Sequence, residues 1–249
     1  MVGIIKSKIR SKKPISFEID EGITITSTGA TNINIPFLVN HVDFFPSSFK
    51  LDVHKNVIYI DPLIVDEEVP ADYILITHPH QDHFSKNDIR KLLKRETKVI
   101  CPKSVFKKLS KELEGYTIIE IKPGDKMDFG NLTIESIEAY NIKSGFWVPH
   151  SKSALYVGYI INSGKVRIYH AGDTDYTPEM MKLKNINLAL TPIDGGKLSM
   201  TTEKAAEFIN NLNPQFAVPM HYMIGTDEVE KFKELVNRNT RIIVMDGLK

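Results

Sequence analysis

Three histidines and one aspartate fall within six consecutive positions, in the segment His78-Pro79-His80-Gln81-Asp82-His83. The apolar residues 73–76 before it are typical of a buried strand, and Ser85 with Asp88 after it resembles the capping box that begins a helix. The cluster is therefore predicted to lie in a loop between a strand and a helix. Imidazole and carboxylate groups that converge in a short loop are ligands that Zn, Mn and Fe take in proteins, so the segment predicts a metal site.

Further donors follow other apolar stretches of the chain. Asp61, Asp173 and His221 each come directly or within three residues after a strand-like run. If these strands lie side by side, their ends bring the donors together. We therefore expect one polynuclear site whose ligands are His78, His80, Asp82, His83, Asp173 and His221.

The elements that must position these donors are a mixture of strands and helices. Strand-like alternation dominates the first seventy residues, and helical spacing of apolar residues begins at Ser85. The predicted helices cover residues 85–93, 105–113, 202–212 and 228–236, and the later strands residues 117–121, 132–139, 154–162, 165–169, 216–220 and 241–245. No linker-like stretch divides the chain, so we expect one domain, residues 1–249, with helices outside packed sheets.

Composition and charge exclude several classes of protein. The 249-residue chain is 42% hydrophobic and 25% charged, as in globular domains and unlike disordered or fibrous proteins. With 32 basic and 31 acidic residues the net charge is +1, which provides no long-range attraction for nucleic acids or anionic membranes. Because Cys101 is the single cysteine and no apolar run approaches about 18 residues, we expect a cytoplasmic protein without a membrane span.

The donor pattern resembles the signature of the metallo-β-lactamase superfamily. Residues 78–83 are similar to the family's H-x-H-x-D-H, and the other strand-end donors stand in the family's order. The resemblance runs from about Ser47 to the C-terminus, and residues 169–175 are similar to the branch of ascorbate-phosphate lactonase-like proteins. It implies an α+β fold, a single-domain αββα sandwich. Residues 1–45 precede the similar part and, from their strand-like alternation, are expected to form an N-terminal β extension.

The resemblance also implies how two divalent ions are held, with Zn preferred over Mn or Fe. The first ion would bind His78 and His80, the second Asp82, His83 and His221, with Asp173 bridging both ions and Asp61 orienting a ligand.

One departure from the family concerns the first ion. Many relatives carry a metal-binding histidine after the strand that precedes the bridging aspartate, where this chain has Asn141. A neutral amide is a poorer ligand for Zn than imidazole. The first site therefore uses Asn141, recruits His150 or binds metal weakly, and His150 could instead contact substrate or lie on the surface.

For function, the resemblance implies a hydroxide, activated by two metal ions, that attacks an ester, lactone or phosphodiester bond of a small substrate. Asp173 would hold this hydroxide and Asp82 would accept a proton. No Gly-x-Ser-x-Gly elbow surrounds a serine, so covalent catalysis is disfavoured. The alternatives are a nuclease acting on RNA or DNA, to which residues 6–13 would offer five basic side chains, and an iron-dependent redox enzyme of the same fold. The oligomeric state stays open.

Overall fold

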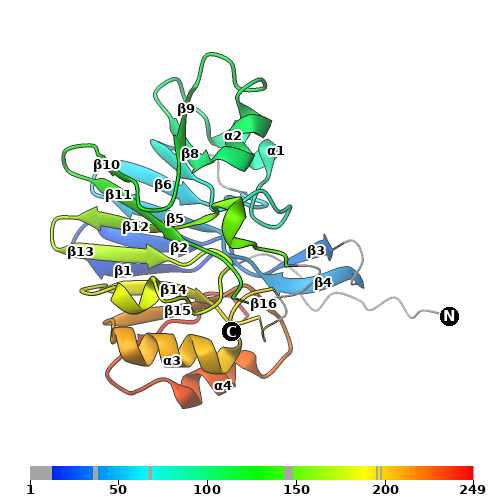
Figure 1. The fold of residues 1–249 in the computed structure, drawn as a ribbon, viewed down its shortest axis with the longest axis vertical. Coiled ribbons are helices and arrows are strands. Elements are labelled where there is room, and N and C mark those ends of the chain that lie inside the picture. Colours follow the sequence, from blue (N-terminus) through cyan, green and yellow to red (C-terminus); the bar gives the residue numbers. More distant parts are fainter. Residues whose placement is uncertain are drawn as a thin grey trace.

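The computed structural model describes residues 13–35, 39–66, 69–142, 148–194, 196 and 198–248. Within these residues two seven-stranded sheets are accompanied by a third sheet of three strands. Helices α1 and α2 lie on one side of the paired sheets and helices α3 and α4 on the opposite side (Figure 1). The layers therefore follow the predicted order of helix, sheet, sheet and helix.

The first large sheet has the strand order β1-β2-β5-β6-β7-β8-β9. Its strands are β1 (Ser16–Asp20), β2 (Ile23–Ser27), β5 (Phe49–Val53), β6 (Asn56–Ile60), β7 (Tyr73–Leu75), β8 (Lys98–Pro102) and β9 (Thr117–Ile121). Strands β1, β2, β5 and β6 pair antiparallel, whereas β6, β7, β8 and β9 pair parallel.

The second large sheet repeats this plan with the order β10-β11-β12-β13-β14-β15-β17. Its strands are β10 (Lys126–Asp128), β11 (Thr133–Glu138), β12 (Val157–Ser163), β13 (Val166–His170), β14 (Leu188–Pro192), β15 (Phe216–Met220) and β17 (Arg241–Ile242). Strands β10 to β13 pair antiparallel, and β13, β14, β15 and β17 pair parallel.

The small sheet and the N-terminal strands account for the described part of residues 1–45, which we expected to be a β extension. Strand β4 (Val39–Phe45) pairs with β3 (Thr31–Ile35) on one side and with β16 (Tyr222–Met223) on the other. Strands β1 and β2 instead join the first large sheet, where β2 is hydrogen-bonded to β5. Residues 16–27 are thus part of the sandwich itself.

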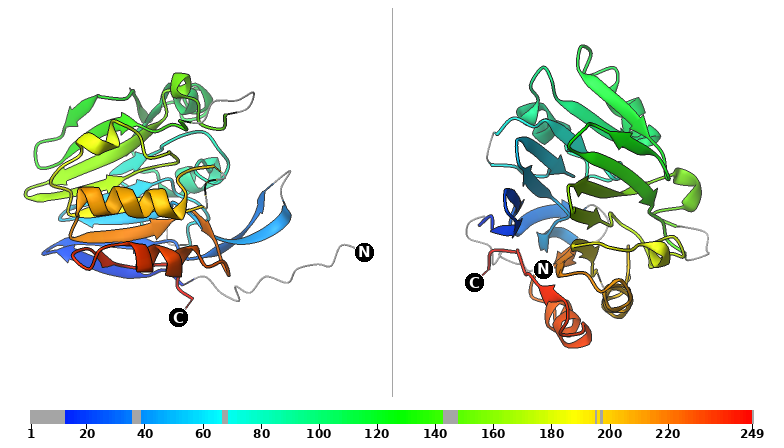
Figure 2. Two further views of the ribbon diagram at one scale, coloured as in Figure 1. Left: turned by 60° about the horizontal axis from the view of Figure 1, so that its bottom comes forward. Right: turned by 90° about the vertical axis from the view of Figure 1, so that its left-hand side faces the viewer.

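Short helices cover the outer faces. They are α1 (Lys86–Leu92), α2 (Lys103–Leu109), α3 (Thr202–Leu212), α4 (Glu228–Leu235) and the 3-10 turns η1 (Lys152–Ala154) and η2 (Met180–Lys182). Helices α3 and α4 pack beside each other (Figure 2). None of the helices in the described ranges has the length and apolar character needed to cross a membrane.

Alternating side chains explain how the layers hold together. In β7, Leu75 packs into the apolar cluster shared by both sheets, whereas its neighbours Ile74 and Ile76 pack into the cluster that contains α1 and α2. Successive residues of a strand point to opposite faces, so a strand with both faces buried must be apolar throughout. Each such side chain stabilises the fold by about 1.5–3 kcal/mol when fully buried.

Candidate metal centre

The predicted donors meet at one edge of the sandwich, where parallel strands end. Asp61 follows β6, residues 78–83 follow β7, Asp173 follows β13 and His221 follows β15. Carboxyl ends of parallel strands lie at the same edge of a sheet, so each sheet contributes donors there.

Two groups of side chains bring their nitrogen and oxygen atoms within 4.8 Å of one another. The first group is His78, His80 and His150, and the second is Asp82, His83, Asp173 and His221.

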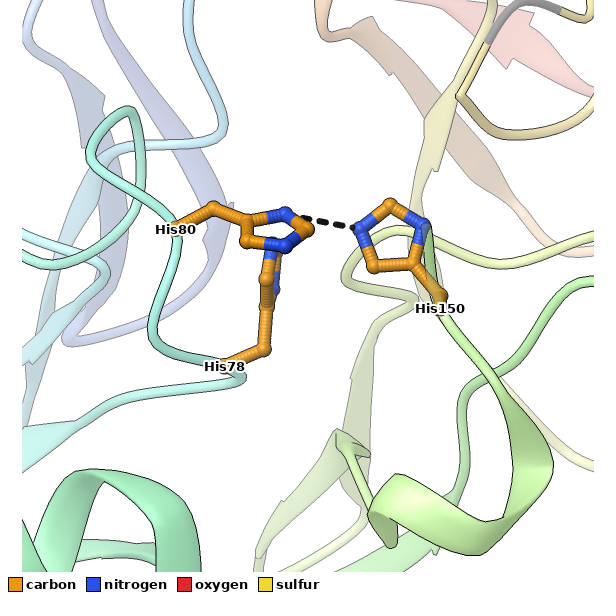
Figure 3. A group of neighbouring side chains, drawn as sticks. All are labelled: His78, His80 and His150. Atoms are coloured by element: carbon orange, nitrogen blue, oxygen red, sulfur yellow. Dashed lines mark hydrogen bonds between the residues drawn. The ribbon is translucent and has the colours of Figure 1, made fainter. Parts of the chain in front are cut away.

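The first group is formed by imidazoles from opposite sides of the edge. Figure 3 shows His78 and His80 on one loop and His150 facing them from another part of the chain. The Nδ1 atom of His80 lies 3.1 Å from the Nε2 atom of His150. The ring of His78 packs edge-on against both, with centroids 4.6 and 4.9 Å away.

Asn141 does not join the first group but holds His150. Its Oδ1 atom accepts hydrogen bonds from the backbone N–H and the Nδ1 atom of His150, at 3.2 and 3.1 Å. Its Nδ2 atom donates to the Leu198 carbonyl at 2.9 Å, and that carbonyl is also 3.0 Å from His150 Nδ1. Because Nδ1 faces two acceptors it carries the proton, so the Nε2 atom of His150 keeps its lone pair for the site.

A chain of hydrogen bonds orients His78 in the same way. The Thr77 hydroxyl donates to Asp61 Oδ2 at 2.6 Å, so its oxygen accepts from His78 Nδ1 at 2.9 Å. The Nε2 atom of His78 is buried and has no hydrogen-bond partner among the described residues. It is therefore an unprotonated nitrogen available to a cation.

The second group is centred on Asp173. Its Oδ1 atom is 3.3 Å from His83 Nε2, and its Oδ2 atom is 3.2 Å from His221 Nε2. His221 Nε2 is also 3.2 Å from Asp82 Oδ2. The same Oδ2 atom of Asp173 lies 3.6 Å from His150 Nε2, so this carboxylate reaches both groups.

Asp61 fixes His83 from behind. Its Oδ2 atom accepts from His83 Nδ1 at 2.8 Å, and its Oδ1 atom accepts from the Thr77 backbone N–H at 2.8 Å. His83 Nδ1 therefore carries a proton, and Nε2 is the ring nitrogen that faces Asp173. A carboxylate behind a histidine ligand is a common arrangement in metal sites, because it fixes the tautomer and raises ligand basicity.

The backbone at the strand ends is strained, and this aims the donors. Asp61 and His221 have φ angles of 45° and 55°, in the left-handed region that costs non-glycine residues about 1–3 kcal/mol. Gly172, before Asp173, has φ 64°, and a Cβ atom there would lie 3.2 Å from Thr77 Cβ. Position 172 therefore requires glycine for Asp173 to approach the loop of residues 78–83.

Asp194 also belongs to this edge, although the sequence pattern assigned it no role. It lies two residues after β14 and accepts hydrogen bonds from the backbone N–H groups of Gly196, Leu198 and Ser199, at 2.8, 2.8 and 2.9 Å. Its Oδ2 atom is 3.9 Å from His221 Nδ1. The sequence does carry a feature that points to Asp194, because this residue follows an apolar strand as several of the predicted metal ligands do.

Burial makes the first group a set of neutral imidazoles. It lowers the pKa of His78 well below the usual value, with the neighbouring His83 adding to the effect. Burial also lowers the pKa of His80, and it lowers the pKa of His150 to about 4. At neutral pH these three rings are therefore uncharged.

Charges dominate the second group. Burial alone would lower the pKa of His83 and His221, but Asp173 raises both above the usual imidazole value. Burial alone would raise the pKa of Asp173, but His221 and His83 hold it well below the usual carboxyl range. Burial opposes the shift at Asp82 too, where His83 and His221 lower the pKa to about 2. The two carboxylates thus remain ionised.

Unpaired buried atoms indicate that this centre fits divalent metal ions. Among the described residues, His78 Nε2, His83 Nε2 and both carboxylate oxygens of Asp173 are buried without a hydrogen bond. Each such atom costs about 1–3 kcal/mol, and a cation bound to imidazole and carboxylate removes that cost. His80 and Asp82 are partly exposed and mark the side open to solvent.

Comparisons with known proteins agree with the fold. The model of the beta-lactamase superfamily domain matches residues 46–222, a segment that contains both donor groups. A UPF0173 protein of Pyrococcus furiosus is 35% identical over 80% of this chain and 91% of its own. A UPF0173 metal-dependent hydrolase of Thermococcus onnurineus is 32% identical over 80% of this chain and 92% of its own.

A solved structure is similar over nearly the whole chain. It is the crystal structure of a candidate metal-dependent hydrolase from Parabacteroides distasonis, with a TM-score of 0.75 and 27% identity. The match covers 95% of this chain and 99% of that chain.

Proposed function

The chain belongs to the β-lactamase superfamily and is a metal-dependent hydrolase, and we propose that it uses two divalent ions to cleave an ester, lactone or phosphodiester bond of a small substrate. The family, the αββα fold and the hydrolase class predicted from the sequence are confirmed. The number of ions, their identity and the bond cleaved are the proposal.

The observation that carries this proposal is the pair of donor groups that share Asp173. One carboxylate oxygen lies 3.2 Å from His221 Nε2 of the second group and 3.6 Å from His150 Nε2 of the first. A carboxylate in this position can bind an ion on each side. Five of the seven donors are imidazoles, which favours Zn or Fe over Mn.

When bound, two divalent cations would lower the pKa of a water molecule towards neutrality and stabilise the attacking and leaving oxygens. Asp173 would orient that nucleophile. Asp82 is ionised and partly exposed, so it can accept a proton at the solvent side. The partly exposed Tyr156 ring lies 5.4 Å from the His78 ring and 6.1 Å from the His150 ring, where it would form a wall of the substrate site.

The two alternative functions, a nuclease and an iron-dependent redox enzyme, can be tested with the same purified protein. Of the basic segment proposed to contact nucleic acid, residues 6–12 lie outside the described residues. The donors suit iron as well as zinc, so the redox alternative depends on which metal the protein carries.

Metal content and hydrolysis provide the test. Protein purified without chelator or added metal is expected to contain about two equivalents of Zn per chain and to hydrolyse bis(p-nitrophenyl) phosphate or a p-nitrophenyl ester, as two-ion catalysis requires. Asp173→Ala should lose both ions and turnover, whereas Asp128→Asn, on the exposed strand β10, should match the wild type. Full activity with one ion, or iron without hydrolysis, would contradict the proposal.

A further inference from the structure

We propose that Asp194 is a positioning residue that couples the two metal positions: it acts on His221 of the second group directly and on His150 of the first group through the Leu198 peptide. The inference rests on the proposed two-ion function. It concerns a residue outside both donor groups.

The direct contact is electrostatic. His221 Nδ1 is buried, has no hydrogen-bond partner among the described residues, and lies 3.9 Å from Asp194 Oδ2. A carboxylate on this side of the ring favours the proton on Nδ1. The lone pair is then on Nε2, the atom that lies 3.2 Å from both Asp82 and Asp173.

The second contact passes through one peptide unit. Asp194 accepts from the Leu198 N–H at 2.8 Å and from the Ser199 N–H at 2.9 Å, which fixes the direction of the loop. The Leu198 carbonyl in turn accepts hydrogen bonds from His150 Nδ1 at 3.0 Å and from Asn141 Nδ2 at 2.9 Å. Without the carboxylate this carbonyl can tilt, and His150 Nδ1 loses one of its two acceptors, so that only Asn141 Oδ1 still favours the proton there.

Asp61 provides a parallel on the opposite sheet. It holds His83 of the second group directly, at 2.8 Å, and reaches His78 of the first group through the Thr77 hydroxyl. Each large sheet therefore supplies one carboxylate near a strand end. That carboxylate contacts a ligand of the second group directly and reaches a ligand of the first group through one intervening residue. If Asp194 only stabilised its own loop, its hydrogen bonds to backbone N–H groups would suffice, and its connections to both His221 and His150 would not be needed.

Cobalt titration tests the coupling. Chelator-stripped wild type and Asp194→Asn are titrated with Co²⁺ against a competing chelator, and the visible cobalt absorption reports the ligand field of each ion. The wild type should bind two equivalents. In Asp194→Asn both binding steps should weaken by about 10–100-fold, the usual effect of removing a residue that orients metal ligands. Weakening of one step alone, or of neither, would overturn the coupling.

Asp88→Asn is the matched control. Asp88 is also a buried carboxylate that accepts backbone N–H groups, those of Ile64 and Val65 at 2.9 and 3.0 Å, but it contacts no donor of either group. Its variant should unfold more easily and still bind two Co²⁺ ions with the wild-type spectrum. If Asp88→Asn reproduced the loss seen in Asp194→Asn, general destabilisation would explain the result and the coupling would be wrong.

A double-mutant cycle separates the two contacts. In a His150→Ala background, Asp194→Asn should no longer change the metal affinity of the first group but should still lower that of the second. The reason is that this background lacks the imidazole that the Leu198 carbonyl holds. An undiminished effect on the first position would refute the relay through Leu198.

A measurement on the wild type covers the case in which the variants do not fold. Long-range ¹H–¹⁵N spectra of the zinc-loaded protein should show His150 and His221 both protonated on Nδ1, and Nε2–H on either ring would overturn the inference. A wild type that binds fewer than two ions contradicts the proposed function instead. Two ions with unchanged affinities in Asp194→Asn contradict only the coupling.

Discussion

Replacing Asp61 by asparagine isolates the role of a buried carboxylate behind a histidine ligand. Asp61 is completely buried, and its oxygens accept from the Thr77 N–H, the Thr77 hydroxyl and His83 Nδ1. Asparagine has the same shape but puts an NH₂ group where one oxygen was. If that group replaces Oδ2, it faces two donors. The Thr77 hydroxyl can rotate, but His83 can only move its proton to Nε2.

The tautomer change removes a ligand. His83 Nε2 lies 3.3 Å from Asp173, so a proton there occupies the lone pair that an ion in the second group needs. Loss of such an orienting partner lowers metal affinity by about 10–100-fold. Two hydrogen bonds to a charged acceptor are also lost, each worth about 1.5–3 kcal/mol, so unfolding should become easier by about 3–6 kcal/mol.

The assay compares wild type, Asp61→Asn and Asp52→Asn. Zinc affinity is measured against a competing chelator, and the free energy of unfolding is measured with urea in the metal-free protein. Asp52 lies on the neighbouring strand β5 and makes a surface ion pair with Lys50, which is worth about 1 kcal/mol or less. Its variant should resemble the wild type in both measurements. Wild-type zinc affinity in a folded Asp61→Asn would refute the tautomer argument.

Two further predictions concern the ligands and their protons. His150→Ala should leave about one tightly bound zinc ion, because the first group then keeps only two imidazoles. Asn141→Ala should retain two ions, with the ion of the first group bound more weakly, because Asn141 only holds His150. Elemental analysis and chelator competition measure both variants, and a larger loss in Asn141→Ala than in His150→Ala would contradict the placement of His150. The pKa values of His83 and His221 are raised, so both rings carry protons that zinc must displace, and affinity at the second group should rise with pH until those raised values are passed. The first group is already unprotonated, with the pKa of His150 at about 4, so its affinity should change little between about pH 6 and 9. Titration calorimetry in buffers of different ionisation enthalpy counts the released protons, and equal release from both groups would disprove this assignment.

Local sequence was sufficient for much of the site because the relevant signals are local. The apolar residues of β7 and the Ser85 cap of α1 bracket residues 78–83, and the structure has the strand, the loop and the capped helix in that order. Helix α2 is less well predicted: it ends at Leu109, although the apolar pattern continues to Leu113. Leu113 is nevertheless buried in the same cluster, so burial, and not helical structure, accounts for the pattern there.

What the sequence by itself determined is a set of six predicted donors and their placement near strand ends, because side-chain chemistry and apolar periodicity are properties of short segments. Only the tertiary structure places His150, and not Asn141, beside His78 and His80, since that placement depends on hydrogen bonds to Leu198, 48 residues beyond His150. The role proposed for Asp194 depends on tertiary structure for the same reason. Its distance to His221 is set by the parallel pairing of β14 with β15, and no local pattern encodes that pairing.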